Sequence, residues 1–131
     1  MIGLDTNILV RYLAQDDPVQ TPKATYLLER ELTRQNPGFI SAVVMVETAW
    51  VLERSYDLAD LQIAKAIEQL LESDALVIEA DRAVFSAMRA LKDGIGSFAD
   101  ALIGLLCAGA GCSCTLTFDR DALRLPGFKL F

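Results

Sequence analysis

The sequence contains no histidine among its 131 residues. This absence excludes catalysis by a histidine general acid or base, Ser-His-Asp triads, and metal sites built from imidazole nitrogens. Any chemistry that the chain performs must therefore use carboxylates, hydroxyls, lysine or a bound metal ion.

Cysteine is scarce, and the three that occur, Cys107, Cys112 and Cys114, are clustered. Their odd number and the lack of paired C-x-x-C motifs argue against a disulfide framework or a structural zinc site. We expect free thiols packed in the hydrophobic core, where unpaired cysteine is common.

Basic residues are outnumbered, with 12 Lys and Arg against 18 Asp and Glu, and the formal net charge is −6. This balance argues against a protein that holds nucleic acid on a broad basic surface. It does not exclude a phosphate-containing substrate that is recruited through a divalent cation.

Long hydrophobic runs are missing as well. The stretch 94–118 has a single charged residue, Asp100, but glycine, serine and cysteine interrupt it, and its apolar run is too short to span a bilayer. The N-terminus lacks the basic segment and apolar segment of a signal peptide. We therefore expect a cytoplasmic protein with no membrane segment.

Short apolar segments that predict strands alternate with amphipathic segments that predict helices. Strands are expected at residues 1–5, 39–40, 76–79, 114–118 and 127–131. Helices are expected at residues 7–14, 23–35, 42–54, 61–73, 82–92 and 98–109, with Thr21, Ser41 and Ser97 among the caps. Continuously apolar strands between helices are typical of a parallel sheet covered on both faces. The sequence predicts one domain over residues 1–131, a three-layer α/β/α fold with a mostly parallel central sheet of about five strands.

Four acidic residues lie where such a fold places its ligand site. Asp5 and Asp119 each follow an apolar strand, whereas Glu47 and Asp100 lie early in apolar helices. Glu47 is the one charge in the stretch 42–51, and we expect it beside the buried face of its helix. The carboxyl ends of parallel strands meet at one edge of the sheet, where ligands bind. We therefore expect the four acids to converge there.

Taken singly, each acid has a simpler interpretation as a helix cap or as the partner of an arginine. Taken together, carboxylates within about 5 Å of one another would repel by about 3 kcal/mol per pair at an effective dielectric constant of about 20. Such a cluster is stable when a cation binds it, and oxygen ligands alone favour Mg²⁺ or Mn²⁺. The sequence therefore predicts a divalent metal site.

The same residues resemble the PIN-domain family over essentially the whole chain. The resemblance rests on four motifs in order: DTN at residues 5–7, Glu47 in a Ser-capped helix, FADALI around Asp100, and TFDRDAL around Asp119. The spacing of the acids resembles that of the VapC-type toxins of bacterial and archaeal toxin-antitoxin pairs.

The resemblance implies a Mg²⁺- or Mn²⁺-dependent endoribonuclease that cleaves RNA. The catalytic and metal-binding residues that it implies are Asp5, Glu47, Asp100 and the more variable Asp119, supported by the polar residues Thr6, Asn7 and Thr117. Asp121 fits the pattern less well and is interpreted as a solvated neighbour. Arg11 and Arg120 are candidate contacts to RNA phosphates, although plain solvation explains each of them equally well.

The resemblance also implies a homodimer and a cognate antitoxin whose tail places a basic residue among the acids. The helices at 23–35 and 61–71 have rich apolar faces, which we expect to line an exposed groove for such a partner. The candidate groove residues are Leu27, Leu28, Leu61, Ile63, Ile67 and Leu70.

Three other functions fit parts of the pattern. A PIN-domain nuclease of RNA processing or maturation has the same site without the toxin role. A non-catalytic α/β binding module would use the acids only as caps and would bind no metal. A haloacid-dehalogenase-like phosphatase also has an acid after its first strand, but it needs a second acid two positions later, where this chain has Asn7.

Overall fold

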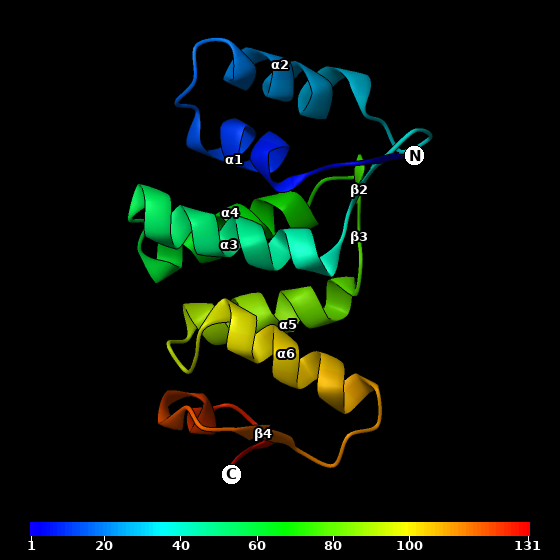
Figure 1. Ribbon diagram of the computed structural model, residues 1–131. Coiled ribbons are helices and arrows are strands. Elements are labelled where there is room, and N and C mark those ends of the chain that lie inside the picture. Colours follow the sequence, from blue (N-terminus) through cyan, green and yellow to red (C-terminus); the bar gives the residue numbers. More distant parts are fainter. The chain divides into compact units, whose positions relative to one another are not determined.

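The computed structural model describes all 131 residues and contains two compact units, Met1–Asp81 and Arg82–Phe131. Figure 1 labels most of their helices and strands. Each unit has its own parallel strands and its own helices. The two units are therefore described separately.

The N-terminal unit contains a three-stranded parallel sheet. Its strands are β1 (Ile2–Gly3), β2 (Gly38–Ile40) and β3 (Leu76–Ile78). β2 lies in the middle and pairs in parallel with both neighbours. The helical elements are α1 (Thr6–Ala14), α2 (Gln20–Tyr26), the π-helical segment η1 (Leu27–Glu31), α3 (Ala42–Tyr56) and α4 (Asp60–Leu71). Each connection between parallel strands thus contains helices, as parallel pairing requires.

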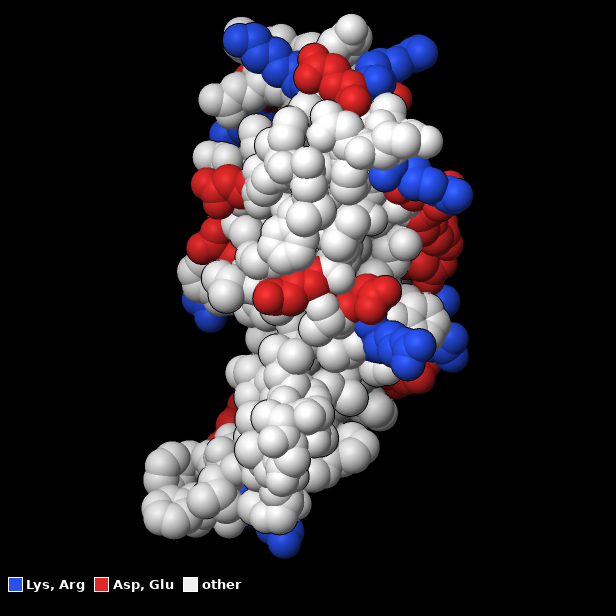
Figure 2. Space-filling view, turned by 90° about the vertical axis from the view of Figure 1, so that its right-hand side faces the viewer, with Lys and Arg blue, Asp and Glu red and all other residues white.

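On the face drawn in Figure 2, charged side chains of both signs lie around a large uncharged area. Lys and Arg lie among Asp and Glu, and that face has no continuous basic area. Ion pairs join Arg34 to Asp74 (3.0 Å) and Arg11 to Asp16 (3.3 Å). Acids thus accompany two of the cations.

The helices that follow β1 and β2 begin at side chains that accept backbone hydrogen bonds. One oxygen of Asp5 accepts from the N–H of the next residue (2.8 Å) at the start of α1. Ser41 Oγ accepts from the N–H three residues on (3.2 Å) at the start of α3. Glu79, which follows β3, accepts from the N–H of Ala42 (2.8 Å). The prediction that Ser41 caps a helix is confirmed.

Large apolar side chains from the sheet and from three helices form the core of this unit. Those with almost no exposed surface are Leu9, Ile40, Met45, Leu52, Ile67 and Leu70. The prediction of an exposed apolar groove is therefore wrong for most of its residues. Leu28, Ile63, Ile67 and Leu70 are buried, while Leu61 is 64% exposed. For the three buried residues of α4, the reason is that α4 packs against α3, so its apolar face belongs to the core.

Two elements are shorter than the sequence predicts. Only Ile2 and Gly3 pair in β1, and both are exposed because β1 lies at the edge of its sheet. The helical segment that begins with α2 ends at Glu31, four positions before Gln35, and Leu32 is already extended and buried. The helix thus stops where the chain becomes extended at Leu32.

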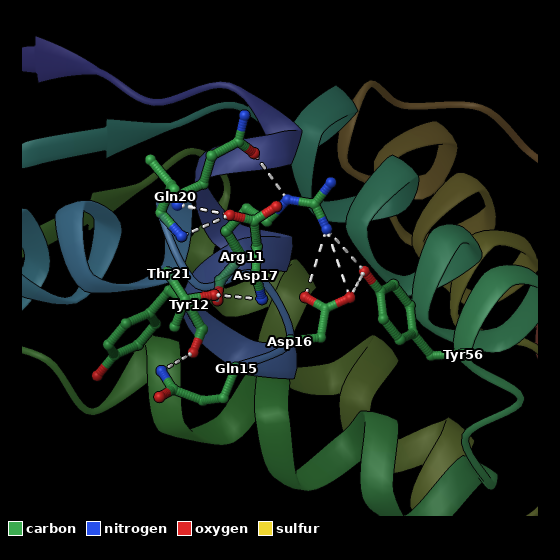
Figure 3. A network of polar contacts seen from close by, with 9 residues as sticks. Arg11, Tyr12, Gln15, Asp16, Asp17, Gln20, Thr21 and Tyr56 are labelled. Carbon is green, nitrogen blue, oxygen red and sulfur yellow. Dashed lines mark hydrogen bonds and ion pairs between the residues drawn. The ribbon is translucent and has the colours of Figure 1, made fainter.

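The start of α2 also differs from the prediction that Thr21 caps it. The carboxylate of Asp17 accepts hydrogen bonds from the N–H groups of Val19 (2.9 Å) and Gln20 (2.6 Å). Figure 3 shows Asp17 beside Gln20. Thr21 is buried instead, and its hydroxyl donates to the carbonyl of Arg11 (2.8 Å). Asp17 therefore caps α2, and Thr21 attaches α2 to α1.

We expect Asp17→Ala to lower the melting temperature at pH 7 by a few degrees, because N–H groups at the start of α2 lose their acceptor. The same hydrogen bonds hold the pKa of Asp17 below its ordinary value. A lowered folded-state pKa gives a stabilising contribution that is complete above the ordinary carboxyl pKa of about 4 and is lost as the pH falls through the folded-state value.

The matched variant Asp17→Asn keeps an acceptor and should retain most of the stability at pH 7 without this acid dependence. Thermal unfolding followed by circular dichroism at pH 7 and at pH 3 distinguishes the three proteins. Equal melting temperatures for Asp17→Ala and the wild type at pH 7 would show that Asp17 does not cap α2.

The C-terminal unit consists of two helices and a two-stranded parallel sheet. Its elements are α5 (Asp81–Lys92), α6 (Phe98–Gly109), β4 (Thr115–Thr117), the 3₁₀ segment η2 (Arg120–Arg124) and β5 (Phe128–Leu130). Buried apolar side chains from both helices include Val84, Met88, Phe98 and Leu102. Gly104 allows α6 to approach β5 closely, because a Cβ atom there would lie 2.6 Å from the ring of Phe128.

Every strand pair within a unit is parallel, in agreement with the predicted mostly parallel sheet, but the five strands do not form one continuous ladder. Hydrogen bonds group them into the three-stranded sheet β1-β2-β3 and the pair β4-β5. Each strand has only two or three paired residues. These strands are shorter than usual. The sequence pattern therefore indicates where each strand lies, but not which neighbouring strand it pairs with.

The cysteines are free thiols, as predicted, but they are not in the core. Cys112 is exposed, and Cys107 and Cys114 are partly exposed. All three lie near the end of α6, where residues 108–113 are exposed, so the surrounding segment provides no apolar interior. In none of the helices is the apolar stretch long enough to cross a membrane.

Candidate active site

Asp5 and Glu47 line one pocket of the N-terminal unit. Asp5 precedes α1, and Glu47 lies in the second turn of α3, which packs against α1. The pocket has a volume of about 390 Å³. Its other lining residues are Thr6, Asn7, Val10, Arg11, Val51, Ser55 and Tyr56. The structure therefore brings together two acids that are far apart in the sequence.

Asp5 caps its helix and still has an unpaired oxygen. Its Oδ1 atom accepts the hydrogen bond from the backbone N–H of Thr6 (2.8 Å). Its Oδ2 atom has no hydrogen-bond partner in the protein, and the residue is exposed. The cap and the ligand interpretations of Asp5 are thus compatible, since each uses a different oxygen.

Glu47 lies on the exposed side of α3, and the prediction that it sits beside the buried face is wrong. Its helical neighbours Val43 and Trp50 are 75% and 51% exposed. The buried face consists of Met45, Thr48, Ala49 and Leu52. Because α3 is apolar on almost every side, its pattern does not reveal which face is buried. The carboxylate of Glu47 has no hydrogen bond or ion pair within the protein.

Two buried hydroxyls beside these acids have no hydrogen-bond partner. They are Oγ1 of Thr6, which lines the pocket, and Oγ1 of Thr48, which follows Glu47. A buried hydroxyl without a partner costs about 1–3 kcal/mol, so its retention needs a reason. For Thr6 a ligand in the pocket would supply the missing partner; nothing in the structure explains Thr48.

The oxygen donors of this pocket fit a hard divalent cation. Asp5 and Glu47 contribute carboxylates without a basic partner, and Thr6 contributes an unpaired hydroxyl. Mg²⁺ and Mn²⁺ prefer such oxygen ligands and complete their coordination shells with water. The donor set therefore suits the metal that the sequence predicts.

Arg11 lines the same pocket and is held in a network that Figure 3 shows. Its Nε donates to Gln20 Oε1 (2.8 Å), and its Nη1 donates to Asp16 (3.3 Å) and to the Tyr56 hydroxyl (3.1 Å). The hydroxyl of Tyr56 donates in turn to Asp16 (2.7 Å). This hydrogen bond to the Asp16 carboxylate raises the pKa of Tyr56 above its ordinary value, because the carboxylate accepts from the protonated phenol.

Sequence reasoning identified Arg11 but missed the residues that hold it. Asp16 and Gln20 lie in the QDDPVQ segment, which the sequence indicates only as a helix break. Tyr56 is 40 positions from Asp16 and ends α3. No periodicity links residues so far apart, and their contact follows only from the packing of α1 against α3.

Asp100 lies in the first turn of α6 in the C-terminal unit. The cap of this helix is Ser97, whose Oγ accepts from the backbone N–H of Asp100 (3.1 Å). The Asp100 carboxylate is half-buried and has no hydrogen bond or ion pair within the protein. The interpretation of Asp100 as a helix cap is therefore wrong, and its partly buried, unpaired charge must have another use or remain a cost.

Asp119 and Thr117 are linked directly after β4. The backbone N–H of Asp119 donates to Thr117 Oγ1 (2.9 Å), and Asp119 Oδ1 accepts from the N–H of Asp121 (2.9 Å). Asp119 thus caps η2 with one oxygen, as Asp5 does for α1. Arg120 and Asp121 are exposed and form no ion pair.

The predicted acids are thus present as two sets. Asp5 and Glu47 share a pocket of the N-terminal unit, while Asp100 and Asp119 belong to the C-terminal unit. Within neither unit do three or more acidic side chains form a metal-binding cluster. The meeting of the two sets in one site stays a prediction.

Comparison with models of known protein families shows which family the chain belongs to. The family model described as PIN domain matches residues 2–127. The chain belongs to the PIN-domain family. A comparison with curated proteins found no match.

Membership of the PIN-domain family confirms the fold class that the sequence predicts. PIN domains have a three-layer α/β/α architecture, and the six α-helices and parallel strands agree with it. PIN domains are generally metal-dependent nucleases that act on RNA or DNA. The match covers both units and all four acids, and it leaves no support for a haloacid-dehalogenase-like phosphatase.

Proposed function

We propose that this PIN domain is a Mg²⁺- or Mn²⁺-dependent endoribonuclease. In this proposal Asp5, Glu47, Asp100 and Asp119 come together as its catalytic, metal-binding acids. The observation that carries the proposal is the pocket shared by Asp5 and Glu47, in which neither carboxylate has a basic partner. The partnerless, half-buried Asp100 gives further support.

The residues of the pocket have separable roles. Asp5, Glu47 and the Thr6 hydroxyl would hold the cation, whose chemistry is to lower the pKa of a bound water and offset charge on the phosphodiester. Asn7 is exposed at the pocket and its amide has no protein partner, so it can donate to a phosphate oxygen. Arg11 can contact the same phosphate or its neighbour through a charge-assisted hydrogen bond.

Water, and not the ribose 2′-hydroxyl, is the nucleophile in this mechanism. Cleavage should therefore leave 5′-phosphate and 3′-hydroxyl ends. The test is to incubate the purified protein with RNA in Mg²⁺, in Mn²⁺ and in EDTA, and to analyse both product ends. Cleavage that persists in EDTA, or products with 2′,3′-cyclic phosphates, would contradict the proposal.

The biological role that we propose is that of a toxin in a toxin-antitoxin pair, acting in the cytoplasm as a homodimer. Support comes from the order and spacing of the four acidic motifs. A basic side chain from an antitoxin tail, placed among the acids, would replace the charge of the metal ion and block cleavage.

Induced expression tests this role. Growth should stop with wild-type protein and resume when the product of the adjacent gene is produced as well. Light scattering should give the mass of a dimer. The second candidate is a PIN nuclease of RNA processing or maturation, for which expression would alter specific RNAs without arresting growth and no adjacent inhibitor would exist.

A further inference from the structure

A second pocket adjoins the pocket of Asp5 and Glu47. It lies between α1 and α2 and has a volume of about 410 Å³. Asn7 and Arg11 line both pockets and are one helical turn apart on α1. A ligand that extends past this shared wall can therefore occupy both pockets.

The polar side chains of the second pocket suit an anion. Arg11 and Lys23 supply two cations, and no acid is among the lining residues. Lys23 is exposed and has no ion pair or hydrogen bond within the protein. This is the reverse of the first pocket, whose acids favour a metal ion, so the two pockets differ in the charge that they attract.

The guanidinium of Arg11 is fixed so that one side remains available. Nε and Nη1 are held by Gln20, Asp16 and Tyr56, as Figure 3 shows. Nη2 makes no hydrogen bond within the protein. Because the side chain is already ordered, a phosphate can bind to Nη2 with little further loss of side-chain entropy.

The rest of the second pocket suits the remainder of a nucleotide. Its apolar lining consists of Ile8, Ala24 and Leu27, against which a base or ribose can lie. The amide nitrogen of Gln20 has no hydrogen-bond partner, since its oxygen is the atom bound by Arg11, so it can donate to the ligand. The pocket thus combines two cations, an amide donor and an apolar wall. A site for a free inorganic ion would not need the apolar wall.

We propose that the pocket between α1 and α2 binds the nucleotide next to the cleaved phosphodiester, with its phosphate on Arg11 and Lys23. The proposal rests on the proposed endoribonuclease function. It accounts for RNA capture by a chain with a net charge of −6 through a few placed cations. In this arrangement Asp16 and Tyr56 are positioning residues for Arg11.

Charge reversal with a matched control tests the subsite. Lys23→Glu is compared with Lys65→Glu on α4, because both lysines are exposed and lack ion pairs. Affinity for a single-stranded RNA oligonucleotide is measured by fluorescence anisotropy in EDTA, so that no cleavage occurs. Lys23→Glu should weaken binding about tenfold, Lys65→Glu less than about twofold, and Lys23→Arg should bind almost as the wild type does.

Salt dependence gives an independent readout. Lys23→Ala should reduce the slope of log affinity against log salt by about 0.7, the value for one lost phosphate contact to a single strand. Replacing the flanking phosphate by a neutral methylphosphonate should weaken binding to the wild type but cause little further loss in Lys23→Ala. A merely structural role of Lys23 would not produce this coupling.

The possible outcomes test the nucleotide subsite and the proposed endoribonuclease function independently. Equal effects of Lys23→Glu and Lys65→Glu, or an equal methylphosphonate effect in wild type and Lys23→Ala, would overturn the subsite even if the wild type cleaves RNA. A wild type that cleaves no RNA would refute the proposed function and with it the placement next to a cleaved phosphodiester, while the binding comparison would still decide whether the pocket between α1 and α2 binds a nucleotide. Lys23→Glu protein that binds RNA normally but no longer binds an inhibitory protein would assign the pocket to that protein instead.

Discussion

Asp5→Asn is expected to reduce RNA cleavage by about 100-fold or more while the protein remains folded. Asparagine is as good a helix cap as aspartate, so the hydrogen bond at the start of α1 can be kept. What the substitution removes is one negative charge and a preferred metal ligand from the pocket. Loss of one such group that stabilises the transition state typically costs about 10²–10³-fold in rate.

Glu47→Gln should cause a loss of similar size, because its carboxylate lines the same pocket and has no other partner. Asp121→Asn is the matched control: it removes an exposed acid close to Asp119 that is bonded only through its backbone, and it should keep most of the activity. Single-turnover cleavage of a labelled RNA measures all three. Unimpaired cleavage by Asp5→Asn would indicate a contaminating nuclease or a different active site.

Mn²⁺ is expected to raise the melting temperature of the wild type, because it binds the folded acids and relieves their repulsion. At a concentration 100 times the dissociation constant, a ligand specific to the folded state stabilises by about 2.7 kcal/mol. For a chain of this length that corresponds to a shift of roughly 10 °C. Thermal unfolding with Mn²⁺ and with EDTA measures the shift.

Asp100→Asn should lose most of this shift and be at least as stable as the wild type in EDTA. The reason is that its half-buried carboxylate has no partner to lose, while Ser97 provides the cap of α6. The matched control Asp93→Asn, which removes an exposed acid from the same unit, should keep the full shift. If Asp100→Asn is markedly less stable in EDTA, Asp100 has a structural role and its assignment to the metal site is wrong.

Local signals in the sequence predict most of the secondary structure. Ser41 and Ser97 precede apolar helical patterns, and both cap the helices that were expected there. At α2 two polar side chains compete for the same role. Asp17 accepts the backbone hydrogen bonds while Thr21 is buried against α1, and the sequence pattern alone does not separate these outcomes.

Predictions that require knowledge of which face is buried are less successful. Glu47 lies on an exposed face because α3 is apolar on nearly all sides. Ile67 and Leu70 were expected in a groove but lie in the core, since the packing of α4 on α3 determines their environment. The partners of Arg11 were missed for the same reason: Tyr56 reaches it only through the packing of α1 on α3.

The central claim is that acids from both units bind one metal site, and calorimetric titration with Mn²⁺ tests it most directly. The proteins to compare are the wild type, Asp5→Asn, Asp100→Asn and the double variant. If the acids share a site, each single variant loses most of the binding and the double variant loses little more, because the effects of residues in one site are not additive. Single variants that each keep an undiminished part of the binding, with losses that add up in the double variant, would show that Asp5 and Asp100 belong to separate sites.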